Sequence, residues 1–268
     1  MKYGFIGTGC MGGALATACA KAIGQEDILL SNRSPEKAQA LAEKLGAIPA
    51  DNETITRDCD VIFLGVKPQT MAQMLLPLQP ILTGRRTPFV LVSMAAGVTI
   101  EALQDMAGGR YPVVRIMPNT ACAVGAGMTT YTCSAEVTDR QRQAVLDALA
   151  ASGLLEEIEE GLMGAASAVA GCGGAYACLF LEGLADGGVL CGLPRKKAQR
   201  MAAQMLLGMA TQALESDEHT GALKDAVCSP AGSTIAGIRK LESMSFRSAA
   251  MEAVIAAWER EREMQQQK

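Results

Sequence analysis

Three glycines near the N-terminus have the spacing of a phosphate-binding loop. Gly7, Gly9 and Gly12 form a G-x-G-x-x-G pattern between a short apolar run at 2–6 and an Ala-rich run that continues to about residue 23. In a strand–turn–helix context the first glycine permits the turn, the second lets backbone approach a pyrophosphate, and the third lets helix and strand pack. The helix N-terminus also offers free N–H groups to phosphate. The pattern predicts dinucleotide binding, rather than an incidental turn, by Ile6, Gly7, Thr8, Gly9, Cys10 and Met11.

The residues about 20 positions further on indicate which dinucleotide is bound. An NAD site would place a carboxylate at the tip of the second strand, on the ribose hydroxyl. This chain has no acid there and has Ser31, Asn32, Arg33 and Ser34 instead. The planar guanidinium of Arg33 can bind a 2′-phosphate, and its three neighbours can donate hydrogen bonds. We expect NADP, with NADPH preferred over NADH. The alternative is that Ser34 only caps a helix starting at Pro35 and that Arg33 is solvated.

The composition narrows the class of protein and its partners. The chain has 268 residues, enough for two domains, and its net charge of −4 without a basic cluster argues against nucleic acid as a partner. Its nine cysteines include no C-x-x-C pair, and it has a single histidine, so we expect reduced thiols and no metal. Because the first residues already belong to a predicted strand, we expect no signal peptide and a cytoplasmic protein.

One stretch has the length of a membrane span without its composition. The 20 residues 162–181 carry no charge, which is enough to cross a bilayer. However, glycine and alanine are abundant in it, acids crowd both ends, and no lysine or arginine lies close by to set an orientation. We expect helices that pack closely inside the protein or a dimer, and no membrane association.

The chain divides into an alternating part and a helical part. Up to about residue 160, strand-like runs alternate with helical runs, which predicts an α/β domain with a doubly wound, mostly parallel sheet over 1–160. Beyond it only helical patterns occur, which predicts an all-α substrate-binding and dimerisation domain over 161–268. Its Ala, Met and Leu content exceeds what one small domain needs, so we expect a homodimer. The expected strands are 2–6, 27–31, 60–66, 88–92, 112–117, 128–131 and 154–158, and the expected helices include 35–45, 69–82, 137–152, 162–170, 174–191, 195–215, 233–242 and 245–265.

Three loops that follow predicted strands add candidates for the cofactor site. Ligands of such sheets bind at the carboxyl ends of the strands, and all three loops belong to that edge. Small residues in one loop would let a ring lie against backbone, and an asparagine in another could meet a carboxamide. Ordinary turn chemistry is the alternative for the prolines and glycines. The candidates are Val66, Lys67, Pro68, Ala95, Ala96, Gly97 and Asn119.

The chain offers few groups for acid–base catalysis. Oxidising an alcohol usually needs a histidine or lysine in the cleft, and 162–181 contains neither. His219 lies in a polar stretch, where we expect a solvated loop. Lys67 could be an acid, although a phosphate or structural contact is at least as good an interpretation. A protonated C=N substrate fits this scarcity, because it is already electrophilic and needs only positioning and one hydrogen-bond partner at nitrogen.

The run from Ser229 to Thr234 could supply that partner. Ser229 to Gly232 reads as a tight turn that leads into a helix beginning near Ser233. Free N–H groups at that N-terminus would hold a small carboxylate without any basic side chain, and Thr234 would place a hydroxyl beside it. A plain capped turn between two helices is an equal alternative.

Along essentially its whole length the sequence resembles the pyrroline-5-carboxylate reductase family. The matching segments, in family-like order and spacing, are 4–11, 66–68, 95–97, 115–120, 192–195 and 229–234. The resemblance implies NAD(P)H-dependent reduction of 1-pyrroline-5-carboxylate to L-proline, the last step of proline biosynthesis. It also implies a Rossmann domain followed by a helical domain that interlocks in a homodimer, and such dimers often form a ring.

The resemblance assigns roles to particular residues. Thr234 would hydrogen-bond the ring nitrogen of a cyclic imino acid, and backbone amides around Gly232 and Ser233, beside Ser229, would hold its carboxylate. Asn52 would contact the adenosine side of the cofactor.

This chain departs from the family pattern at three places. It has Ala170-Gly-Cys-Gly-Gly-Ala-Tyr176 where the family usually has Ser-Gly-Ser-Gly-Pro-Ala-Tyr. Ala121 replaces a usual proline, and Ala231 precedes Gly232 where the family has two glycines. These changes leave open a related reductase of another cyclic imine, and a non-catalytic NADP-binding regulator.

Overall fold

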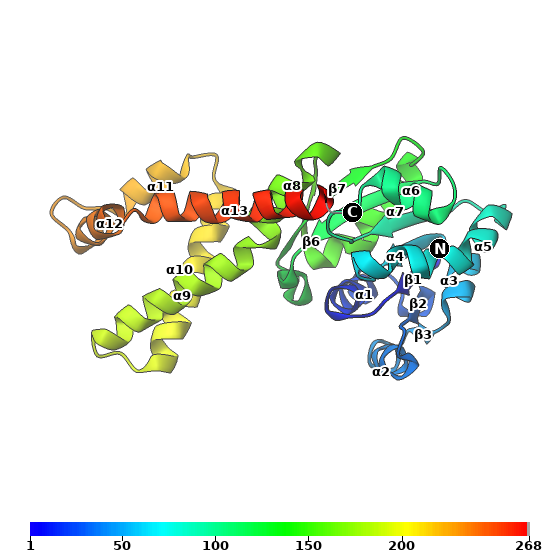
Figure 1. The fold of residues 1–268 in the computed structure, drawn as a ribbon. Coiled ribbons are helices and arrows are strands. Elements are labelled where there is room, and N and C mark those ends of the chain that lie inside the picture. The colour runs from blue at the N-terminus through cyan, green and yellow to red at the C-terminus, as the bar shows by residue number, and fades with distance from the viewer. Residues whose placement is uncertain (267–268) are drawn as a thin grey trace. The chain divides into compact units, whose positions relative to one another are not determined.

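The computed structural model describes residues 1–266, which form two compact units (Figure 1). One unit consists of Met1–Cys172 together with the chain from Ala257 onward, and the other of Gly173–Ala256. The predicted boundary between the two domains lies after residue 160, whereas the contacts between residues divide the chain after Cys172. The domain boundary stays a prediction.

The first unit contains an eight-stranded sheet with strand order β3-β2-β1-β4-β5-β6-β7-β8. All neighbouring strands are parallel except β6 and β7, which run antiparallel. The strands are β1 (Tyr3–Ile6), β2 (Ile28–Ser31), β3 (Ile48–Pro49), β4 (Val61–Leu64), β5 (Val90–Ser93), β6 (Val113–Pro118), β7 (Gly127–Cys133) and β8 (Gly153–Glu157). The predicted doubly wound, mostly parallel sheet is confirmed. The chain reverses its direction of winding between β1 and β4. In open α/β sheets, ligands bind in the crevice at such a reversal, at the carboxyl ends of the strands.

Helices cover both faces of this sheet, because side chains of each buried strand point alternately to the two faces. Phe5 and Phe63 stack with ring centroids 4.3 Å apart on one face, which α1, α2 and α7 cover. Ile62 and Leu64 lie on the other face, against α3, α4 and α6. The helices are α1 (Cys10–Ala22), α2 (Pro35–Leu45), α3 (Asn52–Asp58), α4 (Pro68–Leu75), α5 (Gln79–Gly84), α6 (Ile100–Ala107), α7 (Asp139–Leu149) and α8 (Met163–Ala166).

Two expected helices of this unit have a different form. The expected helix over 69–82 is divided into α4 and α5, since Pro77 and Pro80 each lack the N–H that a continuous helix would use. The expected helix over 162–170 becomes the short α8 followed by a π-helical turn, Ser167–Gly171. A π turn inserts an extra residue per turn and often marks a functional site.

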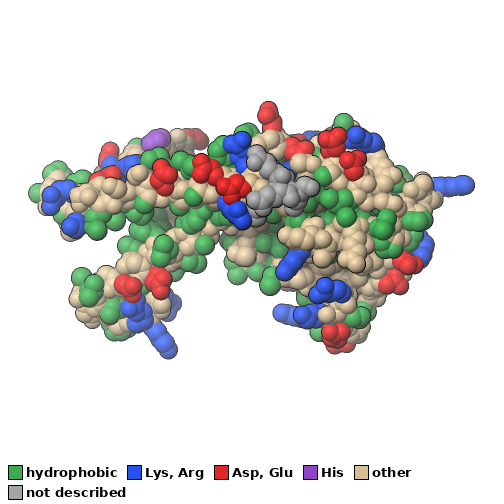
Figure 2. Space-filling model, in the orientation of Figure 1, with side chains coloured by type: hydrophobic (Ala, Val, Ile, Leu, Met, Phe, Trp, Pro, Cys, Tyr) green, Lys and Arg blue, Asp and Glu red, His purple; other side chains and the backbone are tan. Residues whose placement is uncertain are grey.

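The second unit is entirely helical within the described residues. It contains α9 (Gly173–Leu190), α10 (Arg195–Glu215), α11 (Thr220–Ala226), α12 (Ser233–Ser243) and the first part of α13 (Phe246–Gln266). These helices confirm the predictions except for α11, where we expected a loop. Few of their side chains are buried, and Figure 2 shows apolar side chains over the surface of these helices. Such a surface normally lies against another protein surface.

One helical stretch has the length and apolar composition of a membrane span. It runs over Glu160–Leu190, and only 11% of its most apolar window is buried within the chain. Length and composition alone are weak grounds for a membrane span, because a soluble core helix can meet the same criteria.

Candidate active site

The loop between β1 and α1 has the geometry that the glycine pattern predicts. Gly7 adopts a φ of +96°, which L-residues with a side chain rarely adopt, and its N–H donates to the Ser31 carbonyl at 2.9 Å. A Cβ atom at Gly12 or at Gly65 would clash with the carbonyl oxygen of Gly7. Gly7, Gly12 and Gly65 therefore pack β1, α1 and β4 together at the crevice.

Gly9 differs from these glycines because no internal packing requires it. A Cβ atom built there would have no neighbour within 4 Å. Gly9 is the N-cap of α1, which has no side-chain cap and no acidic residue in its first turn. The free N–H groups and positive dipole end of α1 thus face open space beside bare backbone, and this arrangement fits a pyrophosphate.

Side-chain hydrogen bonds from two segments, the loop after β1 and the start of α3, hold the tip of β2. The buried Ser31 hydroxyl donates to Asn52 Oδ1 at 2.5 Å, and Asn32 Nδ2 donates to Thr8 Oγ1 at 3.1 Å. Ser34 occupies the N-cap position of α2, but its side chain makes no capping bond. The structure therefore brings Thr8, Ser31, Asn32 and Asn52 together beside the glycine loop.

Arg33 lies at this tip without any partner. Its side chain is exposed and makes no hydrogen bond or ion pair with the described residues. The whole guanidinium is available to a ligand.

The other predicted cofactor loops follow β4 and β5. Lys67 is the exposed N-cap residue of α4, and Pro68 opens that helix. Gly97 has a φ of +70°, Ala95 is buried and Ala96 is exposed. Because β4 and β5 are parallel neighbours, both loops lie at the same edge of the sheet.

Asn119, which follows β6, is already engaged by the protein. Its Oδ1 accepts from the backbone N–H groups of Ala121 at 3.2 Å and Met128 at 3.3 Å, and its Nδ2 donates to the Ala170 carbonyl at 3.1 Å. One Nδ2 hydrogen remains for a cofactor carboxamide. Asn119 thus also anchors the π-helical turn, a role that its sequence position did not indicate.

An ion pair between a buried arginine and a half-buried glutamate was not predicted. Arg115 on β6 is 3% exposed, and its Nη1 lies 3.0 Å from Glu160 Oε1. The same carboxylate oxygen accepts from the N–H of Ile100 at the start of α6, at 2.7 Å. Further along, the Ser167 hydroxyl bonds to the Glu261 carboxylate on α13. The sequence gives no local signal for these pairs, because their partners lie 45 to 94 residues apart.

In the second unit, residues 229–234 form the predicted turn and helix start. Pro230 is followed by Ala231 at a φ of 58°, and the Gly232 N–H donates to the Ser229 carbonyl at 3.0 Å. These are features of a type II turn, which places glycine where this chain has Ala231. Gly232 is the N-cap of α12, which has no side-chain cap and no acid in its first turn, and Ser233 and Thr234 are exposed there.

His219 is exposed in the loop before α11, as expected, and it also has a structural role. Its Nδ1 accepts from the Gly221 N–H at 3.0 Å and caps α11. The helix that this cap begins was not expected. All nine cysteines are free, and no cluster of metal-ligating side chains occurs among the residues that the structure describes.

Together, the sheet order, the glycine loop and the uncapped start of α1 define a dinucleotide-binding protein of the Rossmann class. Comparison with known proteins narrows this class. The model for "Pyrroline-5-carboxylate reductase dimerisation" matches residues 160–264, and that for "NADP oxidoreductase coenzyme F420-dependent" matches residues 2–97.

Relatives match over the full length. The chain is 39% identical to pyrroline-5-carboxylate reductase of Methanosarcina acetivorans, over 98% of this chain and 97% of the relative. It is also 39% identical to that of Escherichia coli, over 97% and 96%. The crystal structure of the Plasmodium falciparum enzyme with NADP bound has a TM-score of 0.87 at 34% identity, covering 99% of this chain and 98% of that one. The Coxiella burnetii enzyme has a TM-score of 0.90 at 30% identity, covering 98% and 97%. The chain belongs to the pyrroline-5-carboxylate reductase family, and the resemblance found in the sequence is confirmed.

Proposed function

We propose that this protein is an NADPH-dependent reductase that converts 1-pyrroline-5-carboxylate to L-proline, the last step of proline biosynthesis. The observation that supports it most is full-length similarity to reductases of this name, one of which was crystallised with NADP. NADP, when bound in its reduced form, supplies the hydride for the C=N carbon.

The crevice of the first unit fits this cofactor. The open space at Gly9 and the uncapped start of α1 suit the pyrophosphate, and Asn52, which accepts a hydrogen bond from Ser31, would contact the adenosine side. Arg33, which is unpartnered among the described residues, suits a 2′-phosphate. An NAD-specific site would have an acidic residue near this position instead. The loops at Lys67 and Ala96 would border the nicotinamide half.

The turn of the second unit would bind the substrate. Backbone N–H groups of Gly232, Ser233 and Thr234, at the start of α12, would hold the carboxylate, and the Thr234 hydroxyl would hydrogen-bond the imine nitrogen. A protonated imine needs no further acid, so positioning by this hydroxyl and these amides carries the step.

We also propose that the protein works as a homodimer in the cytoplasm, with a ring of dimers as a further assembly, and binds neither membrane nor nucleic acid. The exposed apolar side chains of the second unit and its match to a dimerisation model support the dimer. Covering Glu160–Leu190 with a second subunit would account for its apolar composition without a membrane.

A reductase of a different cyclic imine is the second candidate. Ala231 supports it, because its methyl group stands in a backbone conformation that favours glycine, within the proposed substrate turn. A panel of cyclic imines with different ring sizes would separate the two substrates.

The decisive experiment measures NADPH oxidation by the full-length protein with 1-pyrroline-5-carboxylate and identifies proline as the product. We expect Thr234→Ala to lower kcat by about 10–100-fold, because a hydrogen bond made in the transition state is lost. Thr234→Ser keeps the hydroxyl and should retain most of the rate. Absence of proline from wild-type reactions, with NADPH still bound, would refute the reductase. Equal rates for Thr234→Ala and wild type would refute only the role of Thr234.

A further inference from the structure

One carboxylate of the first unit joins two elements that are distant from it in the chain. Glu160 lies shortly after β8 and is half-buried, and its Oε1 accepts two hydrogen bonds. One comes from Arg115 Nη1 on β6 at 3.0 Å, and the other from the Ile100 N–H at the start of α6 at 2.7 Å. These partners are 45 and 60 residues away from Glu160. The carboxylate therefore ties β6 and α6 to the segment that follows β8.

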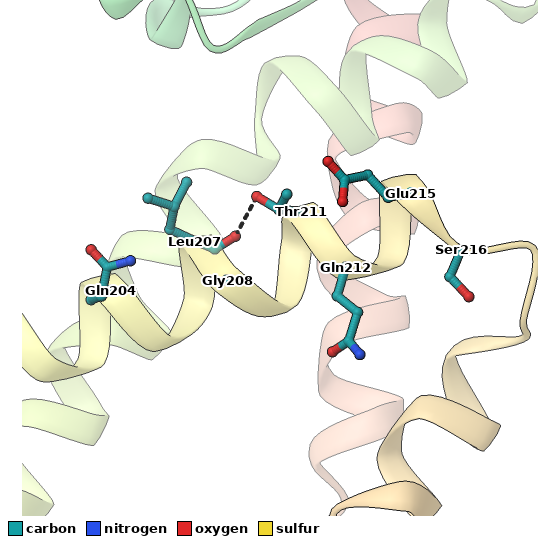
Figure 3. Close-up of a pocket in the computed structure, with 7 residues that line it drawn as sticks. All are labelled: Gln204, Leu207, Gly208, Thr211, Gln212, Glu215 and Ser216. Carbon is teal, nitrogen blue, oxygen red and sulfur yellow. Dashed lines mark hydrogen bonds between the residues drawn. The ribbon is translucent and has the colours of Figure 1, made fainter.

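The surroundings of Glu160 differ from those of an exposed carboxylate. Figure 3 shows Glu215 at the end of α10, beside a shallow hollow that Gln204, Leu207 and Thr211 also line. The Glu215 side chain is exposed and makes no hydrogen bond or ion pair with any described residue. Such a group is solvated and holds no element in place, whereas Glu160 binds a cation that water hardly reaches.

Arg115 depends on this partner. Its side chain is 3% exposed, and its Nε is buried without a hydrogen-bond partner in the described part of the chain. Glu160 is the one acidic group that pairs with it among the described residues. An arginine stays charged even when it is buried, so loss of the partner would leave an uncompensated charge. Arg115 therefore holds Glu160 against β6.

Both ends of the loop between β5 and α6 are fixed relative to Arg115. Ser93, the last residue of β5, is the register partner of Arg115 in the parallel pair of β5 and β6. Ile100, the first residue of α6, is bound by Glu160. Only the six residues 94–99 lie between these two points. The sheet backbone thus places the start of the loop, and the ion pair places its end.

This loop contains Ala95, Ala96 and Gly97, which border the nicotinamide half in the function proposed above. The side chains of Ala95 and Val98 are buried, and the Val98 N–H donates to the Ala95 carbonyl at 3.3 Å. Ala96 is exposed at the tip of the turn that this bond closes. Apolar packing holds the base of the turn, and the bond at Ile100 sets how the turn enters α6.

From this arrangement we infer that Arg115 and Glu160 are positioning residues for hydride transfer, because they fix the loop that borders the nicotinamide. The inference rests on the proposed function, and neither residue touches the reacting atoms. A loop displaced by about 1 Å would move the nicotinamide relative to the substrate, which can lower the rate by up to about 100-fold. The adenosine half would bind as before, since Arg33 and the glycine loop belong to the other flank of the sheet.

Glu160→Ala tests this role, because it removes both hydrogen bonds. In the protein without cofactor, hydrogen exchange measured by mass spectrometry should become faster at the amides of residues 94–103 and stay unchanged at those of residues 7–13. The Kd for NADPH should rise by roughly tenfold, whereas the Kd for adenosine 2′,5′-bisphosphate, which lacks the nicotinamide half, should stay within about twofold. Fluorescence titration and calorimetry measure the two constants.

The rate of hydride transfer gives a further readout. With saturating NADPH and 1-pyrroline-5-carboxylate, the single-turnover rate constant of Glu160→Ala should fall by roughly tenfold. Arg33→Ala should show the opposite division, with weaker binding of the bisphosphate and an unchanged single-turnover rate constant at saturation. Glu159→Ala removes the neighbouring carboxylate, which is exposed and unpaired among the described residues, and it is the matched control.

Two further variants separate positioning from folding. Glu160→Gln keeps an oxygen that can accept both hydrogen bonds, so it should retain most of the wild-type binding and rate. Arg115→Met combined with Glu160→Ala leaves no uncompensated charge in the core, and it should therefore regain stability that Glu160→Ala loses. Its loop end is still unbound, so fast exchange and weak binding of NADPH should persist.

The proposal is overturned if folded Glu160→Ala binds both ligands equally less well, or both as well as wild type does. It is also overturned if the double variant regains wild-type exchange and NADPH binding, since compensation of charge would then be the whole role of the pair. If Glu160→Ala does not fold, the double variant carries the same test. Exchange and binding need no turnover, so a wild type that binds NADPH but forms no proline would refute the reductase while these two measurements still decide the role of the pair.

Discussion

At the scale of a single side chain, we propose that Arg33 distinguishes NADPH from NADH. It is exposed at the tip of β2, and its side chain makes no hydrogen bond or ion pair with the residues that the structure describes. Neighbouring Ser31 and Asn32 are fixed by Asn52 and Thr8, so the backbone that carries the guanidinium is held in place. Because the backbone is already held, phosphate binding has to order only the Arg33 side chain.

Arg33→Ala should raise the KM for NADPH by roughly 10–100-fold, because the charge-assisted hydrogen bonds to the 2′-phosphate are lost. The KM for NADH should stay nearly unchanged, because NADH has a hydroxyl there. Lys37→Ala, in the first turn of α2, removes an exposed cation nearby and serves as the control. Steady-state kinetics with both cofactors measure the effect, and equal losses for NADPH and NADH would contradict this assignment.

The motifs of the candidate site could be recognised in the sequence, because the residues of each motif are close together in the chain. The glycine loop and the absence of an acid after β2 were recognised in this way. The Arg115–Glu160 pair and the second role of Asn119 were not, since both depend on residues that only the fold brings near.

Among the secondary-structure elements, the turn before α12 contains backbone strain. Ala231 has a φ of 58°, which costs an L-residue roughly 1–2 kcal/mol relative to the right-handed region. Glycine would adopt this conformation freely, and the family pattern has glycine there.

Ala231→Gly should therefore raise the free energy of unfolding by about 1 kcal/mol, after the entropy that glycine adds to the unfolded chain is subtracted. Ala250→Gly, at an exposed site inside α13, is the control, and it should lower stability by about 1 kcal/mol. Urea titration of both variants measures the change in the free energy of unfolding and its sign. Destabilisation by Ala231→Gly would mean that the turn does not need a left-handed residue.

For helices and strands with a strong hydrophobic periodicity, the bounds were predicted to within a few residues. These include all the long helices of the second unit. Errors arose where local chemistry overrides periodicity. Two prolines divide α4 from α5, the π-helical turn replaces part of an expected helix, and the His219 cap supports α11 in a polar stretch.

For the molecule as a whole, buried thiols make the free energy of unfolding depend on pH in the alkaline range. Burial raises the pKa of the Cys19 thiol and of the Cys59 thiol to about 12, from an ordinary value of 9.0. The two side chains lie in the cores on opposite faces of the sheet. Burial also raises the pKa of Tyr3.

Because the folded pKa of each thiol exceeds the unfolded one, the stabilisation is complete below pH 9 and is lost as the pH rises toward 12. We expect the free energy of unfolding to decrease between about pH 9 and pH 11, by up to about 1.4 kcal/mol per pH unit for each thiol. Cys19→Ala should flatten this slope, whereas Cys191→Ala, at an exposed thiol, should not. Denaturant titrations across this range measure it, and a slope independent of Cys19 would contradict the linkage.

The order of the strands also bears on how this lineage can change. Because β1 lies between β2 and β4, the tip proposed to bind the adenosine phosphate and the loops proposed to border the nicotinamide come from opposite flanks of the sheet. With these assignments, changes in four consecutive codons, for residues 31–34, would shift coenzyme preference while the loops after β4, β5 and β6 stay unchanged. Selection by the cellular supply of each reduced coenzyme can act on the first flank and selection for turnover on the second, so the two traits can evolve separately.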